Sequence, residues 1–297
     1  MALDLTPAAR ILPAAARDAL LAMGQTQREA LEELRFRVGQ AATAVFLGRE
    51  SVLRGPAGPI MAQPETLSAI VAAACAQSVY AAKESIAQGF VTLPGGHRLG
   101  LCGTAVTAAG GGIGTIREFS SLALRIARPC PGCADAIFER LREDMGSVFL
   151  IGPPGSGKTT ALRELIRRVS DDAGLRVGLA DERGEVAAAS GGAPQLFVGR
   201  RTDVMTGADK ADALMCLLRA MNPQVLAADE ISDEKSARAM ESAANCGVYL
   251  IATAHAHSRG DLLRRPLYRP LVERGVFDYL AVLRRGEPPL VERLERT

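Results

Sequence analysis

The segment GPPGSGKT at residues 152–159 carries the residue types most able to do chemistry in this chain. It matches the pattern G-x-x-x-x-G-K-S/T without a mismatch and lies between an apolar run and an amphipathic stretch of helical periodicity. Glycines let backbone N–H groups curl around a polyphosphate, and the N-terminus of the next helix favours negative charge. The motif predicts a site for ATP. The expected nucleotide-binding residues are Gly152, Pro153, Pro154, Gly155, Ser156, Gly157, Lys158, Thr159 and Thr160.

A P-loop needs an acidic partner, and VLAADE at residues 225–230 provides one at the end of an apolar run. Ligands of an open α/β sheet gather at the carboxyl ends of its strands. We expect Lys158 to reach the β- and γ-phosphates, and Thr159 and Asp229 to hold Mg²⁺. Glu230 is the predicted catalytic residue that polarises the attacking water.

A second acidic cluster, LADERGE at residues 179–185, also follows an apolar run. Asp181, Glu182 and Glu185 could face the same crevice as Asp229, and Glu182 is our further candidate for a catalytic role. The alternative is a charged loop in solvent.

Histidine occurs three times in the chain, and two of the three lie in GVYLIATAHAHS at residues 247–258. VYLIAT is expected to form the strand beside the one that ends at Asp229, which brings His255 close to the γ-phosphate. An imidazole there can donate a hydrogen bond to a phosphate oxygen or to water, so His255 is the third catalytic candidate. The alternatives are a polar structural contact and an H-x-H metal pair without a third ligand. His257 is expected to be a bystander.

Other residues are weaker candidates. Arg200, Arg201, Arg117, Arg125 and Arg128 are each typical surface charges, but as a group they make a contact to a neighbouring subunit's phosphate plausible. CPGC at residues 130–133 has ligand-like spacing without a second pair, so we interpret it as reduced and structural.

Composition limits the partners. The chain has 297 residues, 48% hydrophobic and 23% charged, which is typical of a globular protein. Its net charge of +2 and its 4% of aromatic residues argue against a nucleic-acid surface. The N-terminal stretch does not resemble a signal peptide, and residues 66–82 are too polar for a membrane span. We therefore expect a cytoplasmic protein.

The pattern of the chain changes near residue 146. Before it, short alternating runs (34–38 and 43–47), two Ala-rich helical stretches (65–76 and 79–88) and four further strand-like runs predict an α+β domain with a mostly antiparallel sheet. A turn and connecting helix at 128–145 close this domain, residues 1–145. Residues 146–297 alternate strand and helix, with strands at 148–151, 176–180, 224–228 and 248–253, helices at 158–169, 208–221 and 233–246, and a final strand within 277–285. Uninterrupted apolar runs of this kind favour a parallel sheet.

Together the strings GFVTLPGGHRLGLCGTAV, IREFSSLALRIAR, GPPGSGKTTALRELIR, DERGE, RTDVMTG and AADEIS resemble the stage III sporulation protein AA family of endospore-forming bacteria. The resemblance extends over about residues 25–285. Such proteins are similar to type II and type IV secretion and pilus ATPases, in which an aspartate box and a histidine box accompany the P-loop; DERGE and TAHAHS match them here.

The resemblance implies an α/β fold, with a RecA-like P-loop NTPase domain behind the smaller α+β domain. It implies an ATPase in the mother cell that energises a membrane-embedded channel or secretion complex at the forespore boundary. It also implies a homo-oligomeric ring, usually a hexamer. Two alternatives stay open: a nucleic-acid-associated P-loop ATPase, and a regulator that binds nucleotide but hydrolyses it little.

Overall fold

The computed structural model describes residues 4–75, 86–87, 89–108, 111–128, 130–189 and 192–295. The chain forms two compact units, one of residues 1–129 with 190–195 and the other of residues 130–189 with 196–297. We expected the second domain to begin at residue 146. In the structure the connecting helix α6 (Asp135–Glu143) lies with the second unit, because its apolar side chains Ile137 and Phe138 share a core with those of the helix that follows the P-loop.

The first unit is built on a six-stranded antiparallel sheet with the order β3-β2-β1-β8-β7-β6. Its strands are β1 (Leu31–Arg37), β2 (Thr43–Phe46), β3 (Arg49–Val52), β6 (Phe90–Thr92), β7 (Arg98–Thr107) and β8 (Ile113–Arg125), with a separate pair β4 (Arg54–Gly55) and β5 (Gly58–Pro59). Short helices α1 (Thr6–Arg10), α2 (Ala14–Leu21) and α3 (Gln25–Ala30) precede the sheet, and α4 (Pro64–Cys75) and the 3₁₀ turn η1 (Pro94–Gly96) interrupt it.

Side chains two residues apart on each strand form the core of this unit. Leu34 and Phe36 of β1 and Leu122 and Leu124 of β8 are buried on one face, with helices α1, α2 and α4 contributing to the same core. The predicted antiparallel sheet and the helix at 65–76 are thus confirmed. The second predicted helix, 79–88, lies almost entirely outside the described residues.

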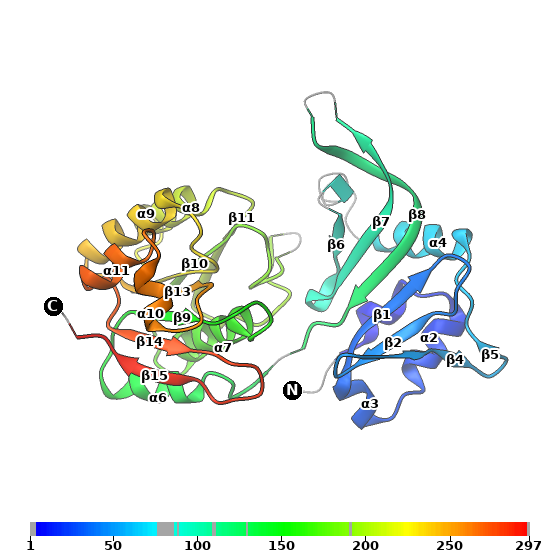
Figure 1. Cartoon of the computed structure of the whole chain (residues 1–297), viewed down its shortest axis with the longest axis horizontal. Helices are drawn as coiled ribbons and strands as arrows, with labels where there is room; N and C mark the ends of the chain where they lie inside the picture. The colour runs from blue at the N-terminus through cyan, green and yellow to red at the C-terminus, as the bar shows by residue number, and fades with distance from the viewer. Residues whose placement is uncertain are drawn as a thin grey trace. The chain divides into compact units, whose positions relative to one another are not determined.

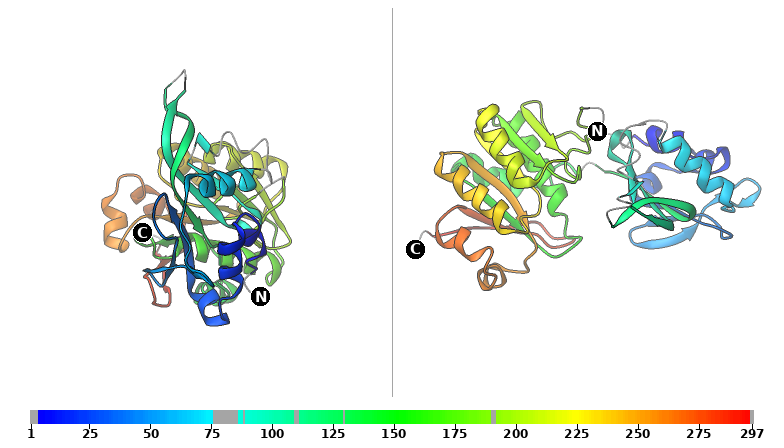
Figure 2. Two further views of the ribbon diagram at one scale, coloured as in Figure 1. Left: turned by 90° about the vertical axis from the view of Figure 1, so that its right-hand side faces the viewer. Right: turned by 90° about the horizontal axis from the view of Figure 1, so that it is seen from above.

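One prediction in this unit was wrong: IGTIREF and LALRIA form a single strand, β8. Figures 1 and 2 show β7 and β8 running on as a two-stranded ribbon beyond the rest of their sheet. Their register shifts between Cys102 and Thr104, opposite a left-handed Glu118 with φ of 47°. A Cβ at Gly103 would lie 2.6 Å from the Arg117 carbonyl oxygen, so the bulge requires glycine there. Because of this bulge, β8 continues through the polar residues between IGTIREF and LALRIA, where the sequence pattern predicts the end of a strand.

The second unit is a seven-stranded sheet with the order β11-β10-β12-β13-β9-β14-β15, parallel except for the last pair. The strands are β9 (Val148–Ile151), β10 (Val177–Asp181), β11 (Thr202–Thr206), β12 (Val225–Ala228), β13 (Tyr249–Ala254), β14 (Tyr279–Val282) and β15 (Leu290–Arg293). The helices are α6, α7 (Lys158–Asp171), α8 (Lys210–Ala220), α9 (Glu234–Asn245), α10 (Arg259–Arg264) and α11 (Arg269–Glu273). This arrangement confirms the expected α/β fold with a mostly parallel sheet.

Helices cover both faces of this sheet. Phe149 and Ile151 of β9 pack in a core with α8 and α9, whereas Val148 and Leu150 pack in a second core with α6 and α7. The right-hand view of Figure 2 shows the two helix layers with the strands between them. Burial on both faces explains the uninterrupted apolar runs. In the described part of the chain, no helix is long and apolar enough to cross a membrane.

Candidate nucleotide site

The P-loop connects β9 to α7 and has the geometry of an anion cradle. Gly155 and Gly157 have φ of 74° and 92°, and nothing lies within 4 Å of where a Cβ would stand on either residue. Side chains are strained at these φ values and would also fill the space above the loop. The Ser156 hydroxyl is buried and finds no hydrogen-bond partner among the described residues. Open space at both glycines and a buried hydroxyl without a described partner, at the N-terminus of a 14-residue helix, fit a phosphate group.

Lys158 is held at the base of the loop. Its Nζ donates to the carbonyl oxygens of Gly152 at 2.9 Å and Pro153 at 3.0 Å, and lies 3.1 Å from Nδ1 of His255. Burial lowers the pKa of Lys158, while the charges of Asp229 and Glu230 oppose that shift. The ammonium group is therefore fixed among acceptors and close to the carboxylates.

Asp229 lies at the carboxyl end of β12, where two hydroxyl groups hold its carboxylate. Thr159 Oγ1 donates to Asp229 Oδ2 at 2.7 Å, and Thr253 Oγ1 donates to Asp229 Oδ1 at 2.5 Å. Hydroxyl and carboxylate oxygens are the ligands that Mg²⁺ prefers, so the pair Thr159 and Asp229 fits that ion. Thr253 was not predicted, although a threonine inside the apolar strand β13 is a visible signal.

Glu230 has a left-handed backbone, with φ of 52°. Its carboxylate lies between two partners, Nη1 of Arg183 and Nε2 of His255, each at 3.5 Å. Because Lys158 Nζ can only donate, Nδ1 of His255 accepts and the ring proton stands on Nε2, which faces Glu230. Strands β12 and β13 are adjacent, as expected. This adjacency brings His255 next to Lys158 and Glu230.

His257, the other histidine of the pair, has different surroundings. The side chain of His257 is exposed, and its backbone N–H donates to Asp261 Oδ2 at 2.9 Å near the start of α10. Nothing in the described part of the chain gathers three or more His, Cys, Asp or Glu side chains as a metal site.

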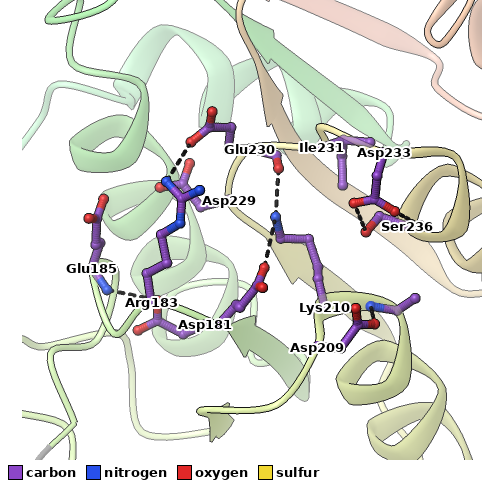
Figure 3. Close-up of polar contacts among 12 residues, drawn as sticks. Asp181, Arg183, Glu185, Asp209, Lys210, Asp229, Glu230, Ile231, Asp233 and Ser236 are labelled. Atoms are coloured by element: carbon purple, nitrogen blue, oxygen red, sulfur yellow. Dashed lines mark hydrogen bonds and ion pairs between the residues drawn. The ribbon is translucent and has the colours of Figure 1, made fainter. Parts of the chain in front are cut away.

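The acidic loop, residues 181–185, lines a small pocket together with Asp229 and Glu230. Asp181, Glu182, Arg183 and Glu185 all contribute to this lining, as expected for the three acidic residues. Figure 3 shows Arg183 beside Glu230. Asp181 is also buried, and it accepts hydrogen bonds from the backbone N–H groups of Glu185, Val186 and Ala187. Burial raises its pKa, while those three N–H groups oppose the shift. Asp181 therefore holds the loop in shape.

Two residues that sequence reasoning missed also shape this loop. Arg163 of α7 donates to the carbonyl oxygens of Val186 at 2.5 Å and Glu185 at 2.8 Å. Lys210, the first residue of α8, lies in the same pocket as Glu182 and Glu230. Neither has a motif around it that would have marked it.

The candidate arginines have different surroundings. Arg201 donates to the Gly174 carbonyl, and β11 begins directly after it, so Arg200 and Arg201 lie at the amino-terminal edge of the parallel sheet, away from the P-loop. In the first unit, Arg125 pairs with Glu33 at 3.3 Å, and Arg128 donates to the Glu29 carbonyl oxygen at 2.6 Å. Arg117 is exposed on β8, and no polar partner is seen for it among the described residues.

The CPGC segment lies at the start of the second unit. Cys130 is exposed, whereas burial raises the pKa of the half-buried Cys133 to about 12. Its Sγ lies 3.9 Å from the Thr160 carbonyl oxygen. A thiol with such a pKa carries almost no thiolate at neutral pH, which favours a structural role.

Known proteins resemble this chain over nearly its whole length. The family described as "Sporulation stage III, protein AA" matches residues 7–294. The chain belongs to this family. It is 34% identical to the stage III sporulation protein AA of Bacillus subtilis over 286 residues, 95% of this chain and 91% of that relative.

Solved structures share the fold at lower identity. The pilus retraction motor PilT, solved with bound ADP, is 17% identical with a TM-score of 0.59 over 90% of this chain and 79% of its own. The ATPase DotB of Legionella pneumophila is also 17% identical, with a TM-score of 0.55 over 93% of this chain and 78% of its own. This chain therefore has the RecA-like fold that is seen in secretion and pilus ATPases.

Proposed function

We propose that the chain is an ATP hydrolase that energises a secretion-like channel complex during endospore formation. The observation that supports this proposal most is that the P-loop lysine, the Thr159–Asp229 pair and Glu230 lie together at one edge of the sheet. His255 lies between Lys158 and Glu230. The similarity of the fold to secretion and pilus ATPases supports this reaction class.

Each residue has a distinct proposed role. The P-loop N–H groups and Lys158 bind and orient the phosphates, and Thr159 and Asp229 would hold Mg²⁺, which supplies charge stabilisation at the phosphates when bound. Glu230 polarises the attacking water, and the Nε2–H of His255 senses the γ-phosphate. Glu182 is the weaker catalytic candidate, since its carboxylate lies beside Lys210 at 3.6 Å.

The cellular role follows from the family description and stays a proposal. We place the protein in the mother-cell cytoplasm, at the inner face of a membrane-embedded complex facing the forespore, as a homo-oligomeric ring, a hexamer by analogy with its superfamily. The formal net charge of +2 gives little attraction for nucleic acid, so no such partner is proposed.

Nucleotide titration and phosphate release test the enzymatic proposal. Lys158→Ala should weaken ATP binding about tenfold or more, because a charge-assisted contact of roughly 1.5–3 kcal/mol is lost. Glu230→Gln should keep ATP binding and slow turnover by about 10²-fold or more, since the base is lost and the cradle is not. Lys235→Ala and Glu234→Gln, which change exposed side chains on α9, are matched controls.

The outcomes separate the alternatives. Equal ATP affinity of the wild type and Lys158→Ala would remove the phosphate assignment. Tight ATP binding without turnover, with or without partner membranes, would identify a nucleotide-binding regulator instead. Retention of single-stranded RNA or DNA on a filter at modest salt would favour the nucleic-acid alternative.

A further inference from the structure

Lys210 occupies a position that a lysine does not ordinarily take. It is the first residue of α8, and only 6% of it is exposed. Burial disfavours the charged ammonium group, and the positive end of the helix dipole repels it. The helix does not need Lys210 for its capping, because Asp209 Oδ1 already accepts the N–H groups of Ala211 and Asp212. The contacts of Lys210 outside its own helix must therefore explain why a buried lysine stands at this position.

Those contacts are made with the turn at Glu230 and with the acidic loop. Nζ of Lys210 donates to the Glu230 carbonyl oxygen at 2.6 Å (Figure 3). It also lies 3.6 Å from the Glu182 carboxylate. The first contact is a short, partly buried hydrogen bond, whereas the second is a longer ion pair to Glu182, whose side chain is 43% exposed. The backbone of Glu230 is therefore the main partner.

The turn at Glu230 is held from several sides. Thr253 Oγ1 accepts the Glu230 N–H at 2.8 Å, the Thr253 carbonyl accepts the Ile231 N–H at 2.9 Å, and the Tyr268 hydroxyl donates to the Ile231 carbonyl at 2.7 Å. Lys210 supplies the remaining bond, to the carbonyl of Glu230 itself. A non-glycine residue keeps a left-handed backbone only when its surroundings determine it, and here these four bonds do so.

We propose that Lys210 is a positioning residue that fixes the left-handed backbone of Glu230 and so aims its carboxylate at the attacking water. The proposal rests on the hydrolase function proposed above. It assigns Lys210 no contact with nucleotide; the lysine acts through the Glu230 peptide, and its contact with Glu182 ties the acidic loop to the same turn.

Kinetics of three variants test the proposal. Lys210→Met keeps the length of the side chain and removes the donor, so kcat should fall about 10- to 100-fold, the scale of a misplaced catalytic group. The Kd for ATP should stay within about threefold, because the P-loop contacts are intact. Lys210→Arg keeps the charge and donors and should recover part of the rate. Lys235→Met, an exposed lysine paired with Asp209 and Asp212, should leave kcat unchanged.

Hydrogen exchange gives a readout that does not depend on hydrolysis. In Lys210→Met the amides of a peptide spanning residues 229–233 should exchange about tenfold faster, which corresponds to the loss of roughly 1.4 kcal/mol. Exchange in β9, residues 148–151, should not change. If the wild type does not hydrolyse ATP but this local effect is seen, the proposed function fails and the positioning of Glu230 stands.

Four results would overturn the proposal. The first is unchanged kcat in Lys210→Met. The second is a weakened Kd with kcat preserved, which would make Lys210 a binding residue. The third is exchange that rises equally throughout the sheet, which would mean a general structural role. The last is a Glu182→Gln variant that reproduces the full loss of kcat, because Lys210 would then act through the acidic loop and not through Glu230.

Discussion

His255 and His257 provide an internal comparison, because the chain places two identical side chains two residues apart in different surroundings. His255 lies between the Lys158 ammonium group at 3.1 Å and the Glu230 carboxylate at 3.5 Å. His257 is exposed, and its hydrogen bond to Asp261 comes from its backbone. Truncation to alanine therefore removes a side chain that links Lys158 to Glu230 in one case and an exposed side chain in the other.

The size of the effect can be worked out from these contacts. In His255→Ala, Lys158 still donates to Gly152 and Pro153, so ATP affinity should be nearly intact. Turnover should fall by roughly 10²-fold, or about 2.7 kcal/mol, the scale of losing one positioned donor. His257→Ala should change turnover less than about threefold, under ~1 kcal/mol.

Asparagine at position 255 refines the test. Its carbonyl can accept from Lys158 as Nδ1 does, but its amide is too short to replace Nε2 opposite Glu230. His255→Asn should therefore recover only part of the lost rate.

Steady-state phosphate release, with bound nucleotide measured in parallel, is the assay. Equal slowing of both alanine variants, or a larger effect of His257→Ala, would refute the assignment of His255 as the γ-phosphate sensor. A turnover that depends on added zinc would instead support a metal role for the H-x-H pair.

Two further predictions concern assembly and pH. A non-hydrolysable ATP analogue should shift the protein to a larger species in light scattering. Arg117→Ala should weaken that shift or lower the turnover of the assembly. A protein that stays monomeric with the analogue would argue against the ring. His97 is buried, accepts the Ala127 N–H and donates to the Asp4 carbonyl, so burial lowers its pKa below the usual 6.5. The unfolded chain then binds more protons than the native one below about pH 6.5. Stability from His97 should be lost as pH falls from that value, and thermal unfolding of His97→Gln should show a weaker dependence between pH 7.5 and 5.5.

The residues of the candidate nucleotide site could be predicted to lie together because its motifs are local. GPPGSGKT fixes a loop between a strand and a helix, and VLAADE carries its carboxylates directly behind a buried strand. The strands β9, β10, β12 and β13 were found for a related reason: each is covered on both faces and reads as a continuous apolar run.

Elements with a weaker pattern escaped prediction. Strand β11 lies at the sheet edge, and its residues Thr202–Thr206 are only partly buried or exposed, so the run is not apolar. Helix α6 was expected with the first domain because the chain enters it from there. Its placement depends on Ile137 and Phe138 sharing a core with strand β9 and helix α7, which follow it in the chain.

The residues that hold Glu230 escaped for a different reason. In sequence, Lys210 is a charged residue at the start of a helix, and its N-cap Asp209 indicates a solvent-exposed end. It becomes a buried contact of Glu230 because β12 is placed next to β10, so the start of α8 meets the turn after Ala228. Thr253 is likewise 24 residues from Asp229, and Lys158 is 97 residues from His255. Strand order decides these contacts. The residues of the proposed phosphate site can therefore be found from motifs, whereas the residues that contact the turn at Glu230 are found only once the order of the strands is known.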